Sequence, residues 1–210
     1  MESSNKKVSF KRKLDFILFG WIVNLAYPQY YRQKYEYLSY YYIFRTYVIP
    51  QKFLRINSRV PWPVHYTSKI GNHQNITKGI LCDPGDNIGI YIQAINKIII
   101  GNNVGFGAGT AIISANHDHY YHSKHNETSP IIIGNNVFVG ANSVILPGVQ
   151  IGNNVVVGAG SVVTKDIPSN CIAVGNPCKP IKQIDNYKET FDINGFNRKI
   201  PKKYQDYFFL

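Results

Sequence analysis

The stretch 131–168, IIIGNNVFVGANSVILPGVQIGNNVVVGAGSVVTKDIP, places an aliphatic residue at every sixth position. These residues are Ile133, Val139, Ile145, Ile151, Val157 and Val163. A period of six fits neither an α-helix, which repeats about every 3.6 residues, nor a half-buried strand, which alternates. It is typical of a coil with three short strands per turn, in which each unit supplies one inward aliphatic side chain and then a bend.

An earlier series with the same spacing predicts that the coil begins near residue 64. Its members are Val64, Ile70, Ile76, Cys82, Ile88, Ala94, Ile100, Phe106 and Ile112. Gly-Asn-Asn recurs at 101–103, 134–136 and 152–154, and these residue types accept a positive φ at low cost. The two series together contain fifteen units, which predict a parallel β-helix of about five turns.

The two series are separated by an insertion. Ile112 and Ile133 lie 21 positions apart instead of six, so about fifteen extra residues interrupt the coil. The interrupting segment 114–130, SANHDHYYHSKHNETSP, contains four of the six histidines of the chain. We expect a coil domain over 64–176, with an inserted loop at about 118–132.

The net charge of +11 is confined to the two ends of the chain. Residues 1–63 carry eleven basic and three acidic residues, and residues 177–210 carry seven basic and four acidic residues. Residues 64–176 carry five of each, so their net charge is zero. The coil therefore has no excess of positive charge with which to bind nucleic acid. The cysteines Cys82, Cys171 and Cys178 have neither disulfide-framework nor metal-site spacing, which predicts reduced thiols in the cytoplasm.

Residues 1–63 are predicted to form a basic, aromatic and mainly helical extension. The apolar run 14–26 is too short to span a bilayer, which favours a buried or membrane-surface helix, with a targeting segment as the alternative. Residues 27–47 contain nine of the sixteen tyrosines, and their spacing predicts a helix that starts near Pro28 and stops at Pro50. A helix of this composition is compatible with peripheral contact with the inner face of the membrane.

Residues 131–182, with the ending GAGSVVTKDIP…GNP, resemble the left-handed β-helix hexapeptide-repeat acyltransferase family. The likeness is strongest to galactoside and maltose acetyltransferases and to sugar or capsule O-acetyltransferases. It implies an all-β core, a left-handed parallel β-helix, to which this chain adds an α-helical N-terminal extension and a short C-terminal helix or tail over 177–210. It also implies acetyl-CoA as co-substrate, a saccharide acceptor, and a homotrimer with its sites between subunits.

Transfer of an acetyl group to a hydroxyl needs a general base, and histidine is the side chain best suited to it near neutral pH. The resemblance places His117 on the catalytic histidine of the family. His119 is expected to wall the site, whereas His122 and His125 are expected to face water. Asp118 is expected to cap a turn, with orientation of an imidazole as the alternative.

The resemblance also assigns residues that would bind the reacting carbonyl oxygen and the coenzyme. Asn87 matches an active-site asparagine of the family, and Asn96 is a weaker candidate, although either residue also fits a structural turn. The predicted coenzyme groove contains Ala141, Ala159, Thr164, Lys165, Lys179 and Lys182. The last two are lysines where related enzymes carry arginines, so they lack the two-pronged donor that a guanidinium offers to phosphate.

Three alternatives stay open on the sequence. His117 and His122 have the spacing of zinc ligands in γ-class carbonic anhydrases, which resemble this fold, but residues 81–100 contain no histidine to serve as a third ligand. N-acetylation of an amino-sugar nucleotide is a second enzymatic possibility. A β-helix without catalysis is the third, and our expectation is an O-acetyltransferase that uses no metal.

Overall fold

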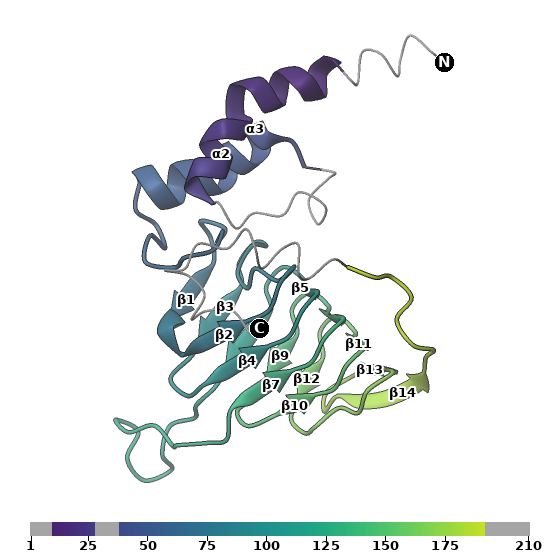
Figure 1. Ribbon diagram of the computed structural model, residues 1–210. Helices are drawn as coiled ribbons and strands as arrows, with labels where there is room; N and C mark the ends of the chain where they lie inside the picture. The colour runs from purple at the N-terminus through teal and green to yellow at the C-terminus, as the bar shows by residue number, and fades with distance from the viewer. Residues whose placement is uncertain (1–9, 28–37, 192–210) are drawn as a thin grey trace.

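The computed structural model describes residues 10–27 and 38–191 of the chain. Strands stack into three sheets that form the faces of a coil (Figure 1). Sheet A contains β1 (Lys69–Gly71), β3 (Tyr91–Gln93), β6 (Ala111–Ile113), β9 (Val144–Ile145) and β12 (Val162–Val163). Sheet B contains β2 (Ile76–Lys78), β4 (Ile98–Ile100), β7 (Ile131–Ile133) and β10 (Gln150–Ile151). Sheet C contains β5 (Val104–Phe106), β8 (Val137–Val139), β11 (Val155–Val157), β13 (Cys171–Val174) and β14 (Lys179–Gln183).

The strand pairings confirm the predicted left-handed parallel β-helix and its insertion. Ile145 pairs with Val163, 18 positions later, which is one turn of three six-residue units. Ile112 pairs with Ile145, 33 positions later, so this turn holds fifteen additional residues. The second asparagine of each Gly-Asn-Asn bend has a φ of 55° or 56°, as the bend chemistry predicts.

The first turn departs from the predicted register. Ile70 pairs with Ile92, 22 positions later, so the turn is four residues longer than a regular one. Ile88 was expected inside the coil but is 56% exposed, whereas Ile90 is buried. The column of inward residues in sheet B, which contains Ile100, Ile133 and Ile151, begins with Lys78 instead of an aliphatic residue.

Lys78 is buried at this position because its polar end is bound on several sides. Its Nζ lies 3.2 Å from Oδ1 of Asp83, and it donates hydrogen bonds to the carbonyl oxygens of Gly79 and Cys82. The ammonium group also lies 5.8 Å from the ring centroid of Trp62, whose side chain is fully buried. Lys78 thus joins the first turn of the coil to the segment that precedes it.

Replacing Lys78 with alanine is expected to destabilise the coil by about 3–5 kcal/mol, because it leaves the Asp83 carboxylate and two carbonyl groups without their cation. Thermal unfolding followed by circular dichroism measures the effect. Lys97→Ala is the matched control, since Lys97 lies one turn further on with its side chain in solvent. Equal melting temperatures for the two variants would contradict the role given to Lys78.

The N-terminal extension forms a small helical layer at the β1 end of the coil (Figure 1). Helical residues 10–15 continue through η1 (Phe16–Gly20) and α2 (Trp21–Ala26), and a second helical stretch contains α3 (Tyr40–Ile43) and η2 (Phe44–Phe53). The two stretches enclose a core of their own. Its buried members are Val23, Tyr27, Tyr40, Ile43, Tyr47 and Val48.

The prediction that Pro50 ends the helix is wrong, because η2 continues to Phe53. Proline disrupts an α-helix because its ring clashes with the carbonyl group four residues earlier. Here the helix is of the wider π type, and the N–H of Leu54 donates to the carbonyl of Ile49, five residues earlier.

The helix start predicted near Pro28 lies outside the described residues. The prediction of one helix up to Pro50 is wrong, because Leu38 and Ser39 are not helical. The helix α3 starts at Tyr40, where the Ser39 side chain accepts from the N–H of Tyr42.

Buried hydrogen bonds fix the extension to the first turn of the coil. The Gln51 side chain is fully buried, accepts from the Tyr27 hydroxyl and donates to the carbonyl of Trp62. The Trp62 indole donates to the carbonyl of Pro84, and the Tyr47 hydroxyl donates to the carbonyl of Asp86. The extension and the coil are therefore packed as one body at this end.

The chain leaves the coil through a hairpin. The strand β14 pairs antiparallel with β13, and it is the first element after the predicted boundary at residue 176. The predicted C-terminal helix lies outside the described residues. Within residues 10–27 and 38–191, every helix is too short or too polar to cross a membrane.

Candidate functional site

The histidine insertion leaves the coil at the edge between sheets A and B. We call this the A–B edge, which comprises residues 72–75, 94–97, 114–130, 146–149 and 164–166. The insertion folds back on itself as a short antiparallel loop, in which His117 pairs with His125. The N–H of Asp118 donates to the carbonyl of Lys124, and the N–H of Asn126 donates to the carbonyl of Asn116. In Figure 1 this loop projects from the coil at the lower left.

A backbone hydrogen bond sets the tautomer of His117. Its Nδ1 lies 2.5 Å from the carbonyl oxygen of His122. A carbonyl oxygen only accepts, so Nδ1 carries the proton and Nε2 of the neutral ring keeps its lone pair. The His117 side chain is exposed to solvent. The arrangement therefore presents an oriented imidazole whose outer nitrogen can accept a proton.

The neighbours of His117 differ in their contacts. His125 is exposed, as the sequence predicted, and its ring also lies against the ring of His117, with 4.4 Å between centroids. The exposed His122 is bound to His117 through its backbone carbonyl. Asp118 accepts from the N–H groups of Tyr120 and Tyr121, which confirms the turn-capping prediction.

Asn96 holds the base of the histidine loop. Its Nδ2 donates to the carbonyl oxygens of Ser114 and Asn126 and to the hydroxyl of Thr128, at 2.8–3.0 Å. Its backbone N–H donates to the Ser114 hydroxyl. Three acceptors share the two amide hydrogens, so Asn96 has no hydrogen left for a reacting oxygen. The residue positions the loop that carries His117.

Asn96→Ala is expected to lower the turnover number about tenfold, because it frees both ends of the loop and loosens the geometry of His117. Limited proteolysis within 114–128 should also become faster. Asn75→Ala is the control, since Asn75 makes the same kind of bond one turn earlier, to the carbonyls of Ala94 and Ile95. Equal cleavage rates in the two variants would contradict the positioning role.

Asn87 and two predicted coenzyme contacts lie at a different edge of the coil. The C–A edge comprises residues 84–90, 107–110, 140–143 and 158–161, between sheets C and A. The Asn87 side chain is exposed, and its Nδ2 donates to the carbonyl of Phe106 at 3.2 Å. Within the described part of the chain this is the only acceptor of Nδ2, so a second hydrogen remains for a ligand. Ala141 and Ala159 follow at the same edge.

The small residues of the C–A edge serve two purposes. A Cβ on Gly140 would lie 2.4 Å from the nitrogen of Ala159, so Gly140 is needed for the stacking of the turns themselves. Gly160, with a φ of 70°, has open space on the side where a Cβ would stand. Ala159 and Gly160 are both exposed. They leave an open strip along which an extended chain such as a pantetheine arm can lie.

The other predicted coenzyme contacts are exposed at separate places. Thr164 and Lys165 lie at the A–B edge, beyond the histidine loop. Lys179 and Lys182 lie on β14, where both are in solvent. Apart from the two lysines of β14, the predicted residues divide into a group around His117 and a group around Asn87, at two edges that border sheet A. One copy of the chain does not bring the two groups together.

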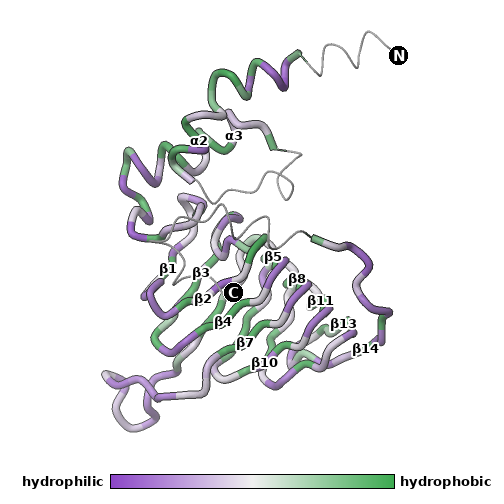
Figure 2. The backbone as a smooth tube through the Cα atoms, in the orientation of Figure 1, coloured by the Kyte–Doolittle hydropathy of each residue, from purple (hydrophilic) through white to green (hydrophobic). Residues whose placement is uncertain are grey.

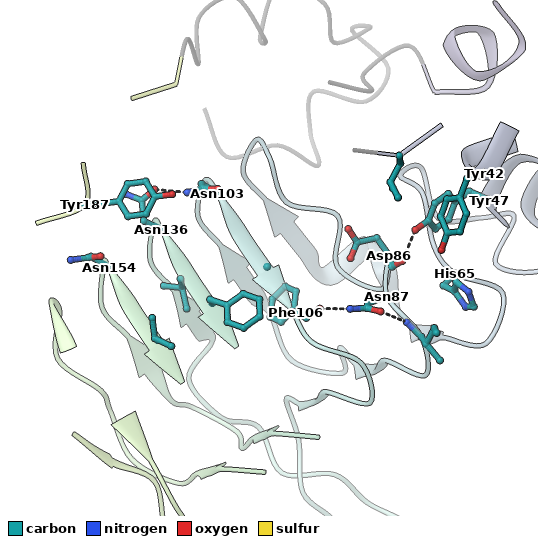
Figure 3. A pocket seen from close by; sticks show the side chains of 16 residues that line it. Tyr42, Tyr47, His65, Asp86, Asn87, Asn103, Phe106, Asn136, Asn154 and Tyr187 are labelled. Atoms are coloured by element: carbon teal, nitrogen blue, oxygen red, sulfur yellow. Dashed lines mark hydrogen bonds between the residues drawn. The ribbon is translucent and has the colours of Figure 1, made fainter. Parts of the chain in front are cut away.

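A groove of about 520 Å³ runs from Asn87 across the outer face of sheet C (Figure 3). Its near end contains His65 and Tyr47, which the sequence analysis did not single out. Its far end contains Tyr187 and a row of corner asparagines. The floor carries Phe138, which is 53% exposed. His65 and Tyr47 come from outside the hexapeptide series, so the sequence pattern gave no signal for them.

His65 differs from His117 in its hydrogen bonding. The backbone N–H of Thr67 donates to Nδ1 of His65 at 3.2 Å, so the neutral ring carries its proton on Nε2. Burial lowers the pKa of His65, which favours this neutral form. His65 thus offers a hydrogen-bond donor to a ligand and has no free lone pair with which to act as a base.

Within 10–27 and 38–191, no three His, Cys, Asp or Glu side chains are grouped as a metal site requires. The cysteines at 82, 171 and 178 are buried, and none forms a disulfide. Burial raises the pKa of Cys171 and Cys178, which disfavours the reactive thiolate.

Comparisons with known proteins agree with this architecture. A family model described as a hexapeptide repeat of succinyl-transferase matches residues 130–165. Protein CapG of Staphylococcus aureus is 55% identical over 145 residues, which are 65% of this chain and 64% of CapG.

Two solved structures also match. A maltose O-acetyltransferase from Clostridium difficile 630 is 41% identical, with 58% of this chain and 61% of that chain covered and a TM-score of 0.44. A galactoside acetyltransferase in complex with coenzyme A is 36% identical. The match covers 52% of this chain and 64% of that chain, with a TM-score of 0.45. The chain spans less than two thirds of each of these three relatives.

The repeat match, the identity to CapG and the observed coil lead to one assignment. The inward residues at 133, 139, 145, 151, 157 and 163 all lie within the matched residues 130–165, and all six belong to the buried core of the coil. Residues 130–165 thus match the hexapeptide-repeat family model, and the chain forms a parallel β-helix from this repeat.

Proposed function

We propose that this protein transfers an acetyl group from acetyl-CoA to a hydroxyl of a sugar or polysaccharide precursor, with His117 as general base. The observation that carries the proposal is the hydrogen bond from Nδ1 of His117 to the carbonyl of His122, which leaves Nε2 as a proton acceptor. The match to the hexapeptide-repeat model of succinyl-transferase supports an acyl-CoA donor, and the similarity to acetyltransferases supports acetyl-CoA. The open strip at Ala159 and Gly160 is compatible with its pantetheine arm.

In this reaction Nε2 of His117 accepts the proton of the acceptor hydroxyl as its oxygen attacks the thioester carbonyl carbon. The carbon–sulfur bond then breaks, and the proton passes from His117 to the departing thiolate. The remaining amide hydrogen of Asn87 is available to the carbonyl oxygen, where negative charge develops. The reaction is a direct transfer in a ternary complex, without an acetylated cysteine, because the three thiols are buried.

The groove beside Asn87 supports a saccharide as the acceptor. Sugars present hydroxyl groups along their edges and apolar C–H groups on their faces. The groove supplies the matching partners, with amides from Asn87 and Asn136 and an exposed aromatic ring from Phe138. Among the described residues that line the groove, Asp86 supplies the only carboxylate.

The distribution of the site residues supports a homotrimer. The A–B and C–A edges both border sheet A, so three copies with sheet A turned toward a common axis bring the A–B edge of one copy beside the C–A edge of the next. His117 of one subunit would then lie near Asn87 of its neighbour. The reaction is proposed to take place in the cytoplasm, where acetyl-CoA is available.

An acetylation screen tests the proposed function. Purified protein is incubated with acetyl-CoA and with monosaccharides, oligosaccharides or lipid-linked glycans, and products are scored by a mass increase of one acetyl group. O-acetyl esters are released by mild base, whereas N-acetyl groups are not, which separates the two chemistries. Titration calorimetry with acetyl-CoA is the companion measurement. Absence of acetyl-CoA binding would exclude the proposal and leave a β-helix that serves as a scaffold.

A further inference from the structure

The N-terminal helix has an apolar surface on the side that faces away from its own core. Helical residues 10–26 pack against α3 and η2 through Phe19, Ile22, Val23 and Ala26. On the opposite side six large apolar side chains are each 45–77% exposed. They are Phe10, Leu14, Ile17, Leu18, Trp21 and Leu25, which we call the outer stripe.

The spacing of the outer stripe shows that it is one continuous surface. Phe10, Leu14, Ile17, Trp21 and Leu25 are separated by steps of three or four residues, and such residues lie along one side of a helix. The stripe extends over the whole described helix, which is about 25 Å long. A stripe of this size is unusual on the free surface of a soluble protein and marks a surface that contacts an apolar partner. Figure 2 shows the hydrophobic residues along this helix, at the end of the molecule remote from β14.

The charge beside the stripe is positive. Lys11, Arg12 and Lys13 are all exposed at the start of the helix. Asp15 is the only acidic residue between 10 and 26, and its carboxylate accepts from the N–H groups of Tyr40 and Tyr41 at 2.6 and 2.8 Å. The acidic group is thus committed to the inner side of the helix, and the charged residues left around the outer stripe are cations.

We infer that the outer stripe docks the protein on the surface of an anionic lipid bilayer, with the helix lying in the plane of the interface. An apolar stripe flanked by cations and containing a tryptophan is the pattern of helices that bind in this way. A second copy packed parallel to the first would bring three cations against three cations, whereas an antiparallel copy would keep them at opposite ends. Neither copy supplies the negative charge that these cations match, and an anionic bilayer does. The inference is independent of the proposed acetyl transfer.

Vesicle binding tests the inference. Full-length protein is sedimented with vesicles of phosphatidylcholine alone or of phosphatidylcholine with about one third phosphatidylglycerol. We expect partitioning onto the anionic vesicles to exceed that onto neutral ones at least tenfold, and high salt to reduce it. The triple variant Ile17→Ser, Trp21→Ser, Leu25→Ser should lose at least tenfold in binding, and so should Lys11→Glu with Lys13→Glu. Ile181→Ser, which removes an equally exposed apolar side chain on β14, should bind like the unaltered protein.

Tryptophan fluorescence reports the same event from inside the stripe. The chain has two tryptophans, and Trp62 is fully buried whereas Trp21 is 63% exposed. A blue shift on addition of anionic vesicles therefore comes from Trp21, and Trp21→Phe should abolish the shift while it preserves binding.

Circular dichroism and sedimentation velocity without lipid check that the variants fold. Failure of the unaltered protein to bind anionic vesicles would overturn the inference, as would a triple variant that binds normally. A triple variant with a changed oligomeric state, combined with no vesicle binding by the unaltered protein, would assign the stripe to a contact between copies.

Discussion

His117→Ala is expected to lower the turnover number of acetyl transfer at least about 10²-fold, because a general base contributes about 10²- to 10⁴-fold to the rate. The imidazole is exposed and lies on an inserted loop, so its removal leaves the coil core intact. The melting temperature and oligomeric state should therefore match those of the unaltered protein. Steady-state kinetics with acetyl-CoA and an acceptor from the screen measures the effect.

His122→Ala is the matched control for this experiment. The contact of His122 with His117 is made by the backbone carbonyl, which the substitution keeps. A loss of less than about threefold is expected, because the proton on Nδ1 of His117 still has its acceptor. If His117→Ala turned over at nearly the normal rate, or if the two variants lost equal activity, the assignment of His117 as the base would be wrong.

Mixed oligomers are expected to recover activity from two inactive variants. His117→Ala removes the base at the A–B edge, and Ala159→Trp blocks the open strip at the C–A edge. In a ring of three subunits that contains both variants, one of the three interfaces joins an intact A–B edge to an intact C–A edge. Mixed trimers should therefore have about one third of normal activity, whereas each variant alone should have about 1% or less.

Co-expression of the two variants with different affinity tags, followed by purification on both tags, isolates the mixed trimers. The control is the same purification of a chain that carries both substitutions together with unaltered chains. A trimer with two unaltered chains keeps one intact interface and one third of normal activity, whereas a trimer with one unaltered chain keeps none. Mixed trimers that stay as inactive as their parents would show that each site is contained within a single chain. The trimeric arrangement of the two edges would then have to be abandoned.

The regular part of the coil was predictable because its chemistry is local. From Ile98 to Val163 each six-residue unit requires one inward aliphatic side chain and one bend. The sequence shows the first as aliphatic residues at fixed spacing and the second as recurring Gly and Asn residues. The length of the insertion followed from the same count. His117 was located through the resemblance, at the point where the regular series stops.

The first turn was not predictable from spacing because two different registers have the same length. Five steps of six residues lead from Ile70 to Ile100, but the structure covers the same 30 positions with a turn of 22 residues, from Ile70 to Ile92, and eight more positions to Ile100. The series therefore placed Ile88 inside, where the structure exposes it. It also passed over Lys78, since a buried lysine is recognisable only when Asp83 and the neighbouring carbonyl groups are seen around it.

The sequence by itself determined the hexapeptide coil, the place and length of the histidine insertion and the positive charge of the ends, because each depends on the kind of residue at a given spacing. Only the tertiary structure decided which partners those residues meet. It set the tautomer of His117 through the His122 carbonyl, placed His117 and Asn87 at different edges of the coil, and turned the outer stripe away from the helical core. These features depend on contacts between segments distant in the chain, which no local spacing records.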